Sequence, residues 1–155
     1  MNEKNLVFRL AERADLPSIV RLLADDERGR LRERVEDPLP EAYYAAFEKI
    51  SRDVNNELIV AVLGKQVVGT LHLIFLRFIG FQGGLRAQIE SVRVDRKHRK
   101  HGIGSEMLKW AIGRAKDRNA YMIQLTTHLS RKDAHRFYER LGFEGTHLGM
   151  KLSLK

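Results

Sequence analysis

Residues 85–106, LRAQIESVRVDRKHRKHGIGSE, contain the stretch of sequence that decides the fold. The first ten residues mix apolar and polar side chains in the alternation of a β-strand with one buried face. Residues 95–101 then crowd basic side chains and histidines together. Gly102 and Gly104 open a segment whose apolar residues recur at helical spacing. The stretch therefore predicts a strand, a basic loop and a helix in direct succession.

The alternation also predicts which way the strand's side chains point. With a regular period of two, Ile89 lies on one face, and Glu90, Val92 and Val94 lie on the other. The helix that follows, from residue 102 to 118, should bury one face. Its apolar residues at helical spacing are Ile103, Met107, Trp110, Ala111 and Ala115.

The junction between loop and helix has the properties of an anion-binding site. A helix N-terminus presents unpaired N–H groups and about half a positive charge. Glycines at 102 and 104 leave room for a phosphate, and Arg99, Lys100 and Ser105 add donors. The pattern is not a Walker loop, and Leu108 occupies the place of a dinucleotide fingerprint's third glycine. A solvated loop that merely caps a helix is the alternative.

The rest of the chain predicts a mixed α/β fold in one domain, residues 1–155. A charged connection with two prolines, residues 27–40, should separate the first two helices. The order begins with an antiparallel meander and continues as strand, helix, strand. The further predicted elements are strands at 5–11, 120–128 and 146–154, helices at 15–26, 41–53 and 131–143, and a hairpin at 57–79 that turns at Gly64.

Composition narrows the classes of function. The chain has no cysteine, which excludes a disulfide framework, a thiolate metal site and a cysteine nucleophile. No secretory leader or membrane span is expected, so we interpret the chain as a cytoplasmic protein. Its net charge of +8 suggests an anionic partner, either nucleic acid, an acidic membrane or a phosphorylated small molecule.

Three motifs resemble the GNAT superfamily of acyl-CoA-dependent N-acetyltransferases. Residues 99–104, RKHGIG, are similar to its loop Arg/Gln-x-x-Gly-x-Gly/Ala, and IESVRV resembles its fourth strand. AHRFYERLGF, residues 134–143, resembles its late helix, which ends in Tyr-x-x-x-Gly-Phe. The segment 125–147 looks most like aminoalkylphosphonate and small-amine acetyltransferases. The resemblance implies a mostly antiparallel twisted sheet, flanked by helices and splayed between strands 4 and 5.

The resemblance also implies acetyl-CoA as cosubstrate and assigns residues to it. The amide-bearing arm would pair with the fourth strand's backbone, and the pyrophosphate would lie on the loop amides. Many family members have Asn where this chain has Arg131, so that contact must be replaced or absent. The implied cofactor-binding residues are Val92, Arg93, Val94, Arg99, Lys100, His101, Gly102, Ile103, Gly104, Ser105, Arg131, Ala134 and Phe137.

Acetyl transfer to an amine needs proton transfers at two points. A primary amine, with a pKa of about 10.4, must lose a proton before it attacks, and Glu90 is the candidate base, directly or through water. The resemblance places Tyr138 as the acid that protonates the departing thiolate. Glu90 paired with Arg93 or Arg86, and Tyr138 as a packing residue, are the structural alternatives. No covalent enzyme intermediate is required.

Other functions remain open at this point. A nucleic-acid-binding domain could use the basic stretch 93–101, and a GNAT-like module could bind acyl-CoA without catalysis. No pair of histidines has a ligand at diagnostic spacing, so no metal is expected. We expect a small amine as acceptor, no nucleic acid or membrane partner, and a homodimer by resemblance. Arg28, Arg30, Arg32 and Arg34 would suit an acceptor that also carries an acidic group.

Overall fold

The structure, a computed structural model, describes residues 5–154 and contains one five-stranded sheet in the order β1-β2-β3-β4-β5. The first four strands are paired antiparallel, and β5 joins β4 in parallel. This arrangement confirms the predicted mixed α/β fold. The strands are β1 (Leu6–Leu10), β2 (Asn56–Leu63), β3 (Gln66–Arg77), β4 (Leu85–Val94) and β5 (Met122–Leu125).

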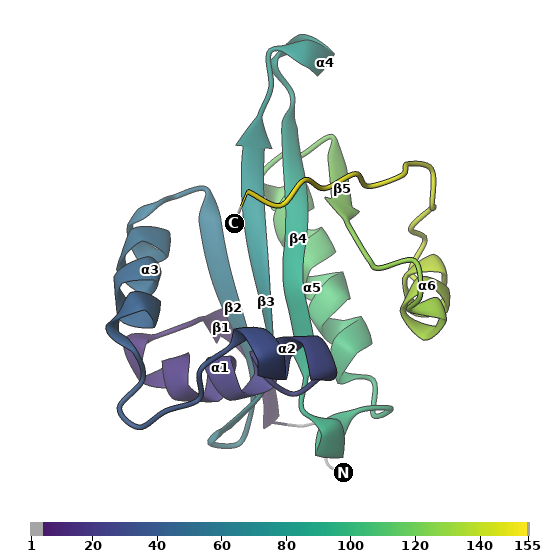
Figure 1. Ribbon diagram of the computed structural model, residues 1–155. Helices are drawn as coiled ribbons and strands as arrows, with labels where there is room; N and C mark the ends of the chain where they lie inside the picture. The colour runs from purple at the N-terminus through teal and green to yellow at the C-terminus, as the bar shows by residue number, and fades with distance from the viewer. Residues whose placement is uncertain (1–4, 155) are drawn as a thin grey trace.

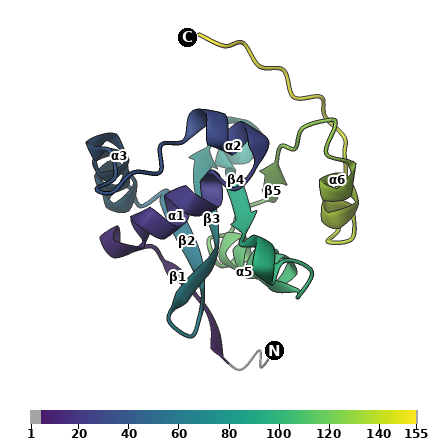
Figure 2. The same cartoon turned by 60° about the horizontal axis from the view of Figure 1, so that its bottom comes forward.

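Helices cover both faces of the sheet (Figures 1 and 2). One face carries α5 (Ile103–Asp117), and α1 (Leu16–Leu23), α2 (Glu27–Arg32) and α3 (Glu41–Arg52) lie on the other. After β5 the chain forms α6 (Lys132–Glu139), beside the N-terminal end of α5. A short turn, α4 (Gly80–Gly83), links β3 to β4.

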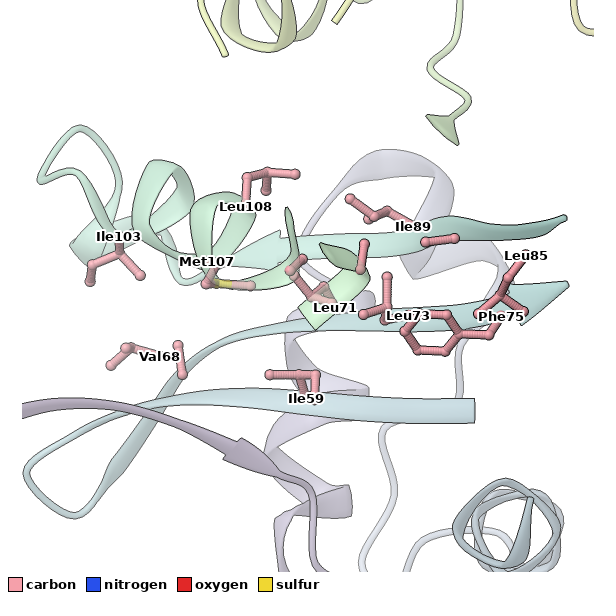
Figure 3. Close-up of a cluster of buried hydrophobic side chains, with 14 residues drawn as sticks. Ile59, Val68, Leu71, Leu73, Phe75, Leu85, Ile89, Ile103, Met107 and Leu108 are labelled. Carbon is pink, nitrogen blue, oxygen red and sulfur yellow. The ribbon is translucent and has the colours of Figure 1, made fainter. Parts of the chain in front are cut away.

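The main core lies between α5 and the sheet (Figure 3). Ile103, Met107, Ala111 and Ala115 are buried there, and Trp110 packs partly against them, as the helical spacing predicted. The remaining buried members of this core are Ile59, Ala61, Val68, Leu71, Leu73, Phe75, Leu85, Ala87, Ile89 and Leu108.

The predicted side-chain phase of β4 is wrong after Glu90. The register passes from His72 opposite Glu90 to Thr70 opposite Arg93, so β4 contains one extra residue at this point. This is a β-bulge, and Ser91 adopts a φ of 55° within it. Because an extra residue shifts the period by one, the side chains at 92 and 94 join Ile89 on the α5 face instead of sharing a face with Glu90.

Three other segments differ from the sequence-based expectation. The connection 27–40 contains a helix, α2, whose first turn is capped by the Asp26 carboxylate accepting from Gly29 N at 2.6 Å. The strand expected at 120–128 shortens to β5, because only four residue pairs join it to β4. The last predicted strand, 146–154, is not formed, and the sheet of the described chain ends at β5.

Candidate active site

β4 parts from β5 in the middle of its length. The last pair between them is Ile89 with Leu125, but β4 continues to Val94. In the described chain, residues 90–94 are therefore paired on the β3 side only. The sheet is splayed between strands 4 and 5, as the resemblance implied.

The freed edge of β4 presents the backbone groups of Val92 and Val94. Asp95 N donates to Val68 O at 2.8 Å, and antiparallel pairing makes alternate residues face the partner strand. The backbone N–H and C=O groups of Arg93 therefore point toward β3, and those of Val92 and Val94 point away from β3. Side-chain contacts agree, because Arg93 Nη1 donates to Val92 O and Arg99 Nε to Val94 O, both at 2.9 Å.

The same edge leads to the N-terminus of α5. Gly102 is the N-cap residue with a φ of 81°, a left-handed conformation that favours glycine. A Cβ atom at Gly102 would meet no atom within 4 Å, so the helix opens to free space at this point. At Gly104 a Cβ would lie 3.4 Å from Cζ of Phe137, which makes this glycine a contact point for α6.

The basic loop is partly neutralised by Asp25, which lies between α1 and α2. Asp25 Oδ1 lies 2.8 Å from Arg96 Nε, and its Oδ2 lies 3.1 Å from Arg99 Nη2. Lys100 and His101 are exposed beside Gly102. Lys100 thus places a positive charge at the opening of the helix.

Glu90 lies opposite His72 and forms no ion pair with any described residue. Its Oε1 accepts a hydrogen bond from Gln88 Nε2 at 2.9 Å. Neither arginine proposed as a structural partner binds it, since Arg86 donates to Tyr121 and Gln124, and Arg93 approaches Asp26. The structural alternative for Glu90 is therefore wrong.

His72 is a half-buried imidazole with one assigned hydrogen bond. Its Nε2 lies 2.8 Å from Asn56 Oδ1, and Asn56 Nδ2 donates to Asp53 at 2.7 Å. This orientation of the amide makes Nε2 the donor and leaves Nδ1 as the acceptor of the neutral ring. Burial lowers the pKa of His72, against the opposing effect of the Glu90 charge.

A cavity of about 150 Å³ lies between α1, α3 and the sheet, on the same face as His72. Its polar wall consists of Thr70, His72 and Ser91 at the bulge of β4. The other walls are formed by Tyr43 and by apolar side chains. These apolar side chains are Leu16, Ile19, Val20, Leu23, Ala46, Phe47, Ile50 and Leu58.

A second group of charges surrounds Tyr138. Burial raises the pKa of the Tyr138 hydroxyl, and the positive charges of Arg131 and Arg93 oppose this effect. Arg93 is itself largely buried, with a side chain 16% exposed, and burial lowers its pKa. Its Nη2 lies 3.3 Å from Asp26 Oδ2, and its Nε is buried without a hydrogen-bond partner in the described chain. The Tyr138 ring also packs edge-on against Phe137 and Phe143.

Comparison with known proteins identifies the family. The model of the acetyltransferase (GNAT) family matches residues 16–143. The chain belongs to the GNAT family. It is an acyltransferase, and acetyl-CoA is the cosubstrate of this family.

Individual relatives show how far the likeness extends. An aminoalkylphosphonate N-acetyltransferase of Salmonella typhimurium is 31% identical over 107 residues, 69% of each chain. A solved structure described as a transcriptional regulator from Bacillus halodurans C-125 is 49% identical, with a TM-score of 0.94, 97% of this chain and 100% of that chain being covered. A predicted acetyltransferase from Clostridium acetobutylicum, solved with acetyl-CoA, is 22% identical over 96% of each chain, with a TM-score of 0.73.

The GNAT site residues that were named from the sequence lie in separate groups in the structure. Glu90 lies with His72 and Gln88, and Tyr138 with Arg93 and Arg131. Between these groups and the start of α5 runs the edge of β4. Ala134 and Arg131 line a shallow pocket of about 350 Å³ at the start of α6, together with Ser130, Lys132 and Asp133.

Sequence reasoning missed the acidic and amide partners in this GNAT site. Asp25 forms ion pairs with the loop residues Arg96 and Arg99, and Asp26 forms one with Arg93. Asn56 orients His72 through a hydrogen bond. The Asp-x-x-Gly spacing before α2 signalled a local cap at Asp26. Its ion pair with Arg93 depends on the fold, because 67 positions separate the two residues, 93 minus 26.

The described residues contain neither a cluster of metal ligands nor a membrane-spanning helix. No group of three His, Asp or Glu side chains within 5–154 is placed to hold a metal ion. Over the same span, no helix is long and apolar enough to cross a membrane.

Proposed function

We propose that this chain transfers the acetyl group of acetyl-CoA to the primary amine of a small acceptor by direct attack. The observation that carries the proposal is the freed edge of β4, which runs from Glu90 into the open N-terminus of α5. A strand edge offers hydrogen bonds to an amide-bearing arm, and a helix N-terminus attracts a pyrophosphate. One continuous surface thus fits both parts of the cosubstrate.

The cosubstrate's arm would bind the backbone groups of Val92 and Val94, with Arg93 between them. The carbonyl oxygens of Val92 and Val94 now accept hydrogen bonds from the side chains of Arg93 and Arg99. The cosubstrate's arm must displace these side chains. The pyrophosphate would lie on the amides of residues 99–105, including Ile103 and Ser105, where Lys100 adds positive charge and the His101 ring can add a hydrogen-bond donor. Ala134 and Phe137 support this arrangement through α6, since Phe137 reaches the start of α5 at Gly104.

Glu90 is the proposed base, and its environment supports this role. No cationic side chain within residues 5–154 forms an ion pair with it, so its carboxylate is available to take a proton from an ammonium group. His72 lies opposite and stays neutral near pH 7 because burial lowers its pKa. A neutral imidazole with a free Nδ1 can accept a hydrogen bond from the amine or from a bridging water. The amine nitrogen then forms its bond to the thioester carbon as the carbon–sulfur bond breaks.

Tyr138 is the proposed acid for the departing thiolate. Burial raises its pKa, so the hydroxyl keeps its proton at neutral pH. The positive charges of Arg93 and Arg131 near Tyr138 would also stabilise the negative charge of the departing thiolate. The aromatic contacts of Tyr138 orient the ring and are compatible with this role.

The acceptor we propose carries an anionic group besides its amine. Arg32, Arg93 and Arg131 lie near one another and share Asp26 as a counter-charge. A relative of 31% identity is described as an aminoalkylphosphonate N-acetyltransferase. Two arginines of the segment 28–34 contribute less than expected, because Arg28 contacts His128 and Arg34 pairs with Glu36.

The test combines calorimetric titration of acetyl-CoA with thiol release from a panel of amines. The panel pairs each aminoalkylphosphonate or amino acid with an amine of equal length that lacks the acid. Micromolar binding and faster thiol release with the anionic member of each pair are expected. Equal rates for both members would contradict the anionic acceptor, and the absence of acetyl-CoA binding would contradict the whole proposal.

A regulatory acyl-CoA-binding module is the second candidate. The 49% identical relative is described as a transcriptional regulator, which favours this alternative. Acetyl-CoA binding without thiol release from any amine would support it. Direct nucleic-acid binding through 93–101 is less well supported, because Arg96 and Arg99 are paired with Asp25 and Arg93 is largely buried.

A further inference from the structure

The imidazole of His72 is the end of a series of three hydrogen-bonded side chains. His72 lies on β3, between β2, which carries Asn56, and β4, which carries Glu90. Its Nε2 lies 2.8 Å from Oδ1 of Asn56, and Nδ2 of Asn56 donates to Oδ2 of Asp53 at 2.7 Å. We refer to Asp53, Asn56 and His72 as the polar triad. It leads from the turn before β2 to the residue that lies opposite Glu90.

The carboxylate of Asp53 fixes the direction of both hydrogen bonds in the polar triad. A carboxylate only accepts, so the group of Asn56 that faces it is the amide nitrogen. The amide oxygen of Asn56 then faces His72 and also only accepts, so Nε2 carries the ring proton. Nδ1 of the neutral ring keeps its lone pair, and none of the hydrogen bonds within residues 5–154 engages it. The tautomer of His72 is thus determined by a side chain that does not contact the ring.

The turn that carries Asp53 is held on several sides. The other carboxylate oxygen, Oδ1, accepts from Asn55 N at 2.8 Å, and Asn56 N donates to Asp53 O at 2.9 Å. Arg118, just after α5, donates to Val54 O at 2.7 Å. The carboxylate therefore has a fixed position from which it orients Asn56.

The tautomer matters for an amine that reacts between His72 and Glu90. An alkylammonium group has three N–H bonds, and Glu90 takes one of these protons in the proposed reaction. The amine that remains has two N–H groups and the lone pair that attacks the thioester carbon. Nδ1 without a proton accepts a hydrogen bond from one N–H group and leaves the attacking lone pair free. A proton on Nδ1 would donate to that lone pair and oppose the attack.

We propose that Asp53 and Asn56 are positioning residues for acetyl transfer, which keep the proton of His72 on Nε2 so that Nδ1 binds an N–H of the acceptor amine. The cavity that His72 lines gives the acceptor access to the ring. Asp53 and Asn56 act on the amine only through His72. This inference rests on the proposed function, because it assigns a role to His72 in that same reaction.

The groups around His72 leave the ring neutral above pH 7. Burial lowers the pKa of His72, and the negative charge of Glu90 on β4 opposes this effect. Asp53 lies behind Asn56, Tyr43 of α3 lines the same cavity, and α1 contributes apolar side chains to it. In this pH range the tautomer alone decides whether Nδ1 accepts or donates.

The first test replaces one oxygen atom at the far end of the polar triad. In Asp53→Asn, the remaining oxygen can still accept from Asn55 N, and the new amide nitrogen faces Asn56. Asn56 must then turn its oxygen toward position 53 and its nitrogen toward His72, which moves the ring proton to Nδ1. Ring ¹⁵N NMR spectra above pH 7, assigned with His72→Gln, should show the change. The kcat for thiol release should fall at least about tenfold at nearly unchanged acetyl-CoA affinity, because the wrong tautomer disables a catalytic histidine.

The second test restores the tautomer by exchanging the two polar groups. In the double variant Asp53→Asn with Asn56→Asp, the amide at position 53 donates to the carboxylate at position 56, which accepts from Nε2 of His72. The ring proton should return to Nε2, and thiol release should recover. The adjacent carboxylate should also raise the pKa of His72, so the acid limb of the rate profile should move to higher pH. Asp117→Asn, at an exposed carboxylate of α5, is the control and should change neither the spectra nor the rate.

The two measurements separate this inference from acetyl transfer itself. An unchanged tautomer in Asp53→Asn would overturn the positioning role, whatever the rate of thiol release. A reversed tautomer with an unaltered kcat would show that Nδ1 does not bind the reacting amine. If the original chain bound acetyl-CoA but released no thiol from any amine, the proposed function and the catalytic role of His72 would both fail, and the NMR spectra would still decide whether Asp53 and Asn56 set the tautomer.

Discussion

The two halves of β4 differ in what their edges and side chains do. Residues 86–89 are paired with both β3 and β5, and Leu85, Ala87 and Ile89 are buried in the core that α5 covers. Residues 90–94 keep β3 as a partner, contain the bulge at Ser91 and present an unpaired edge. The comparison shows how one strand combines two tasks: the first half anchors the strand in the core, and the second half has no described strand beside it on the β5 side, where we propose that the cosubstrate binds.

The largest expected effect comes from Glu90→Gln in the second half. Removing the proposed base should lower kcat/KM by about a hundredfold or more, because general-base catalysis contributes about 10²–10⁴-fold. The free energy of unfolding should change by less than about 0.5 kcal/mol, since Gln is isosteric. Thiol-release kinetics and urea unfolding measure the two quantities. Glu106→Gln, the same change at an exposed site on α5, is the control, and equal activities of both variants would remove Glu90 from the mechanism.

Ile89→Ala, in the first half, should show the opposite pattern. Ile89 is 2% exposed, and truncating a buried isoleucine costs about 2–5 kcal/mol through lost burial and the cavity left behind. Urea unfolding should report this loss. At temperatures where the variant stays folded, acetyl-CoA affinity should remain within about twofold of the original, a shift of about 0.4 kcal/mol. A large loss of affinity without a loss of stability would mean that the two halves are not separate in function.

Tyr138→Phe tests the proposed acid for the departing thiolate. The substitution keeps the aromatic contacts with Phe137 and Phe143 and removes the hydroxyl. We expect kcat to fall by about tenfold, less than for the base, because a thiolate with a pKa of about 8.5 leaves with modest assistance. Acetyl-CoA affinity by calorimetry should be nearly unchanged. An unaltered kcat would make Tyr138 a packing residue.

The pH dependence of stability offers a smaller test at His72. Its folded-state pKa lies below the ordinary value of 6.5, so the unfolded chain binds the proton more readily than the folded one. Stability should therefore fall as the pH drops below about 6.5, and His72→Gln should make this decline shallower. Urea midpoints at several pH values between 7 and 5 measure the slope. His147→Gln, at an exposed histidine, is the matched control, and identical slopes for all three proteins would contradict the prediction.

What the sequence predicted well was local in origin. The helix at 103–117 follows from spacing alone, and the glycines at 102 and 104 lie at its start, as expected. The side-chain phase of residues 92 and 94 was wrong because the bulge lies at a serine, a residue that gives no signal of positive φ. The partners Asp25 and Asp26 could not be predicted, since their ion pairs join α1 and α2 to distant parts of β4 and its loop.

The smallest expected effect concerns the bulge that separates the two halves. Ser91 has a φ of 55°, which costs a non-glycine residue about 1–2 kcal/mol. Ser91→Gly removes that strain but gives the unfolded chain more freedom, worth about 0.5–1 kcal/mol, so the net gain in stability should be about 0.5–1 kcal/mol. Ser91→Val, whose branched side chain disfavours this conformation, should instead destabilise the fold. Because the bulge lies just beyond the last residue of β4 that pairs with β5, we expect Ser91→Val also to weaken acetyl-CoA binding and Ser91→Gly to preserve it. If valine lowered neither stability nor affinity, the freed edge of β4 would not depend on the bulge.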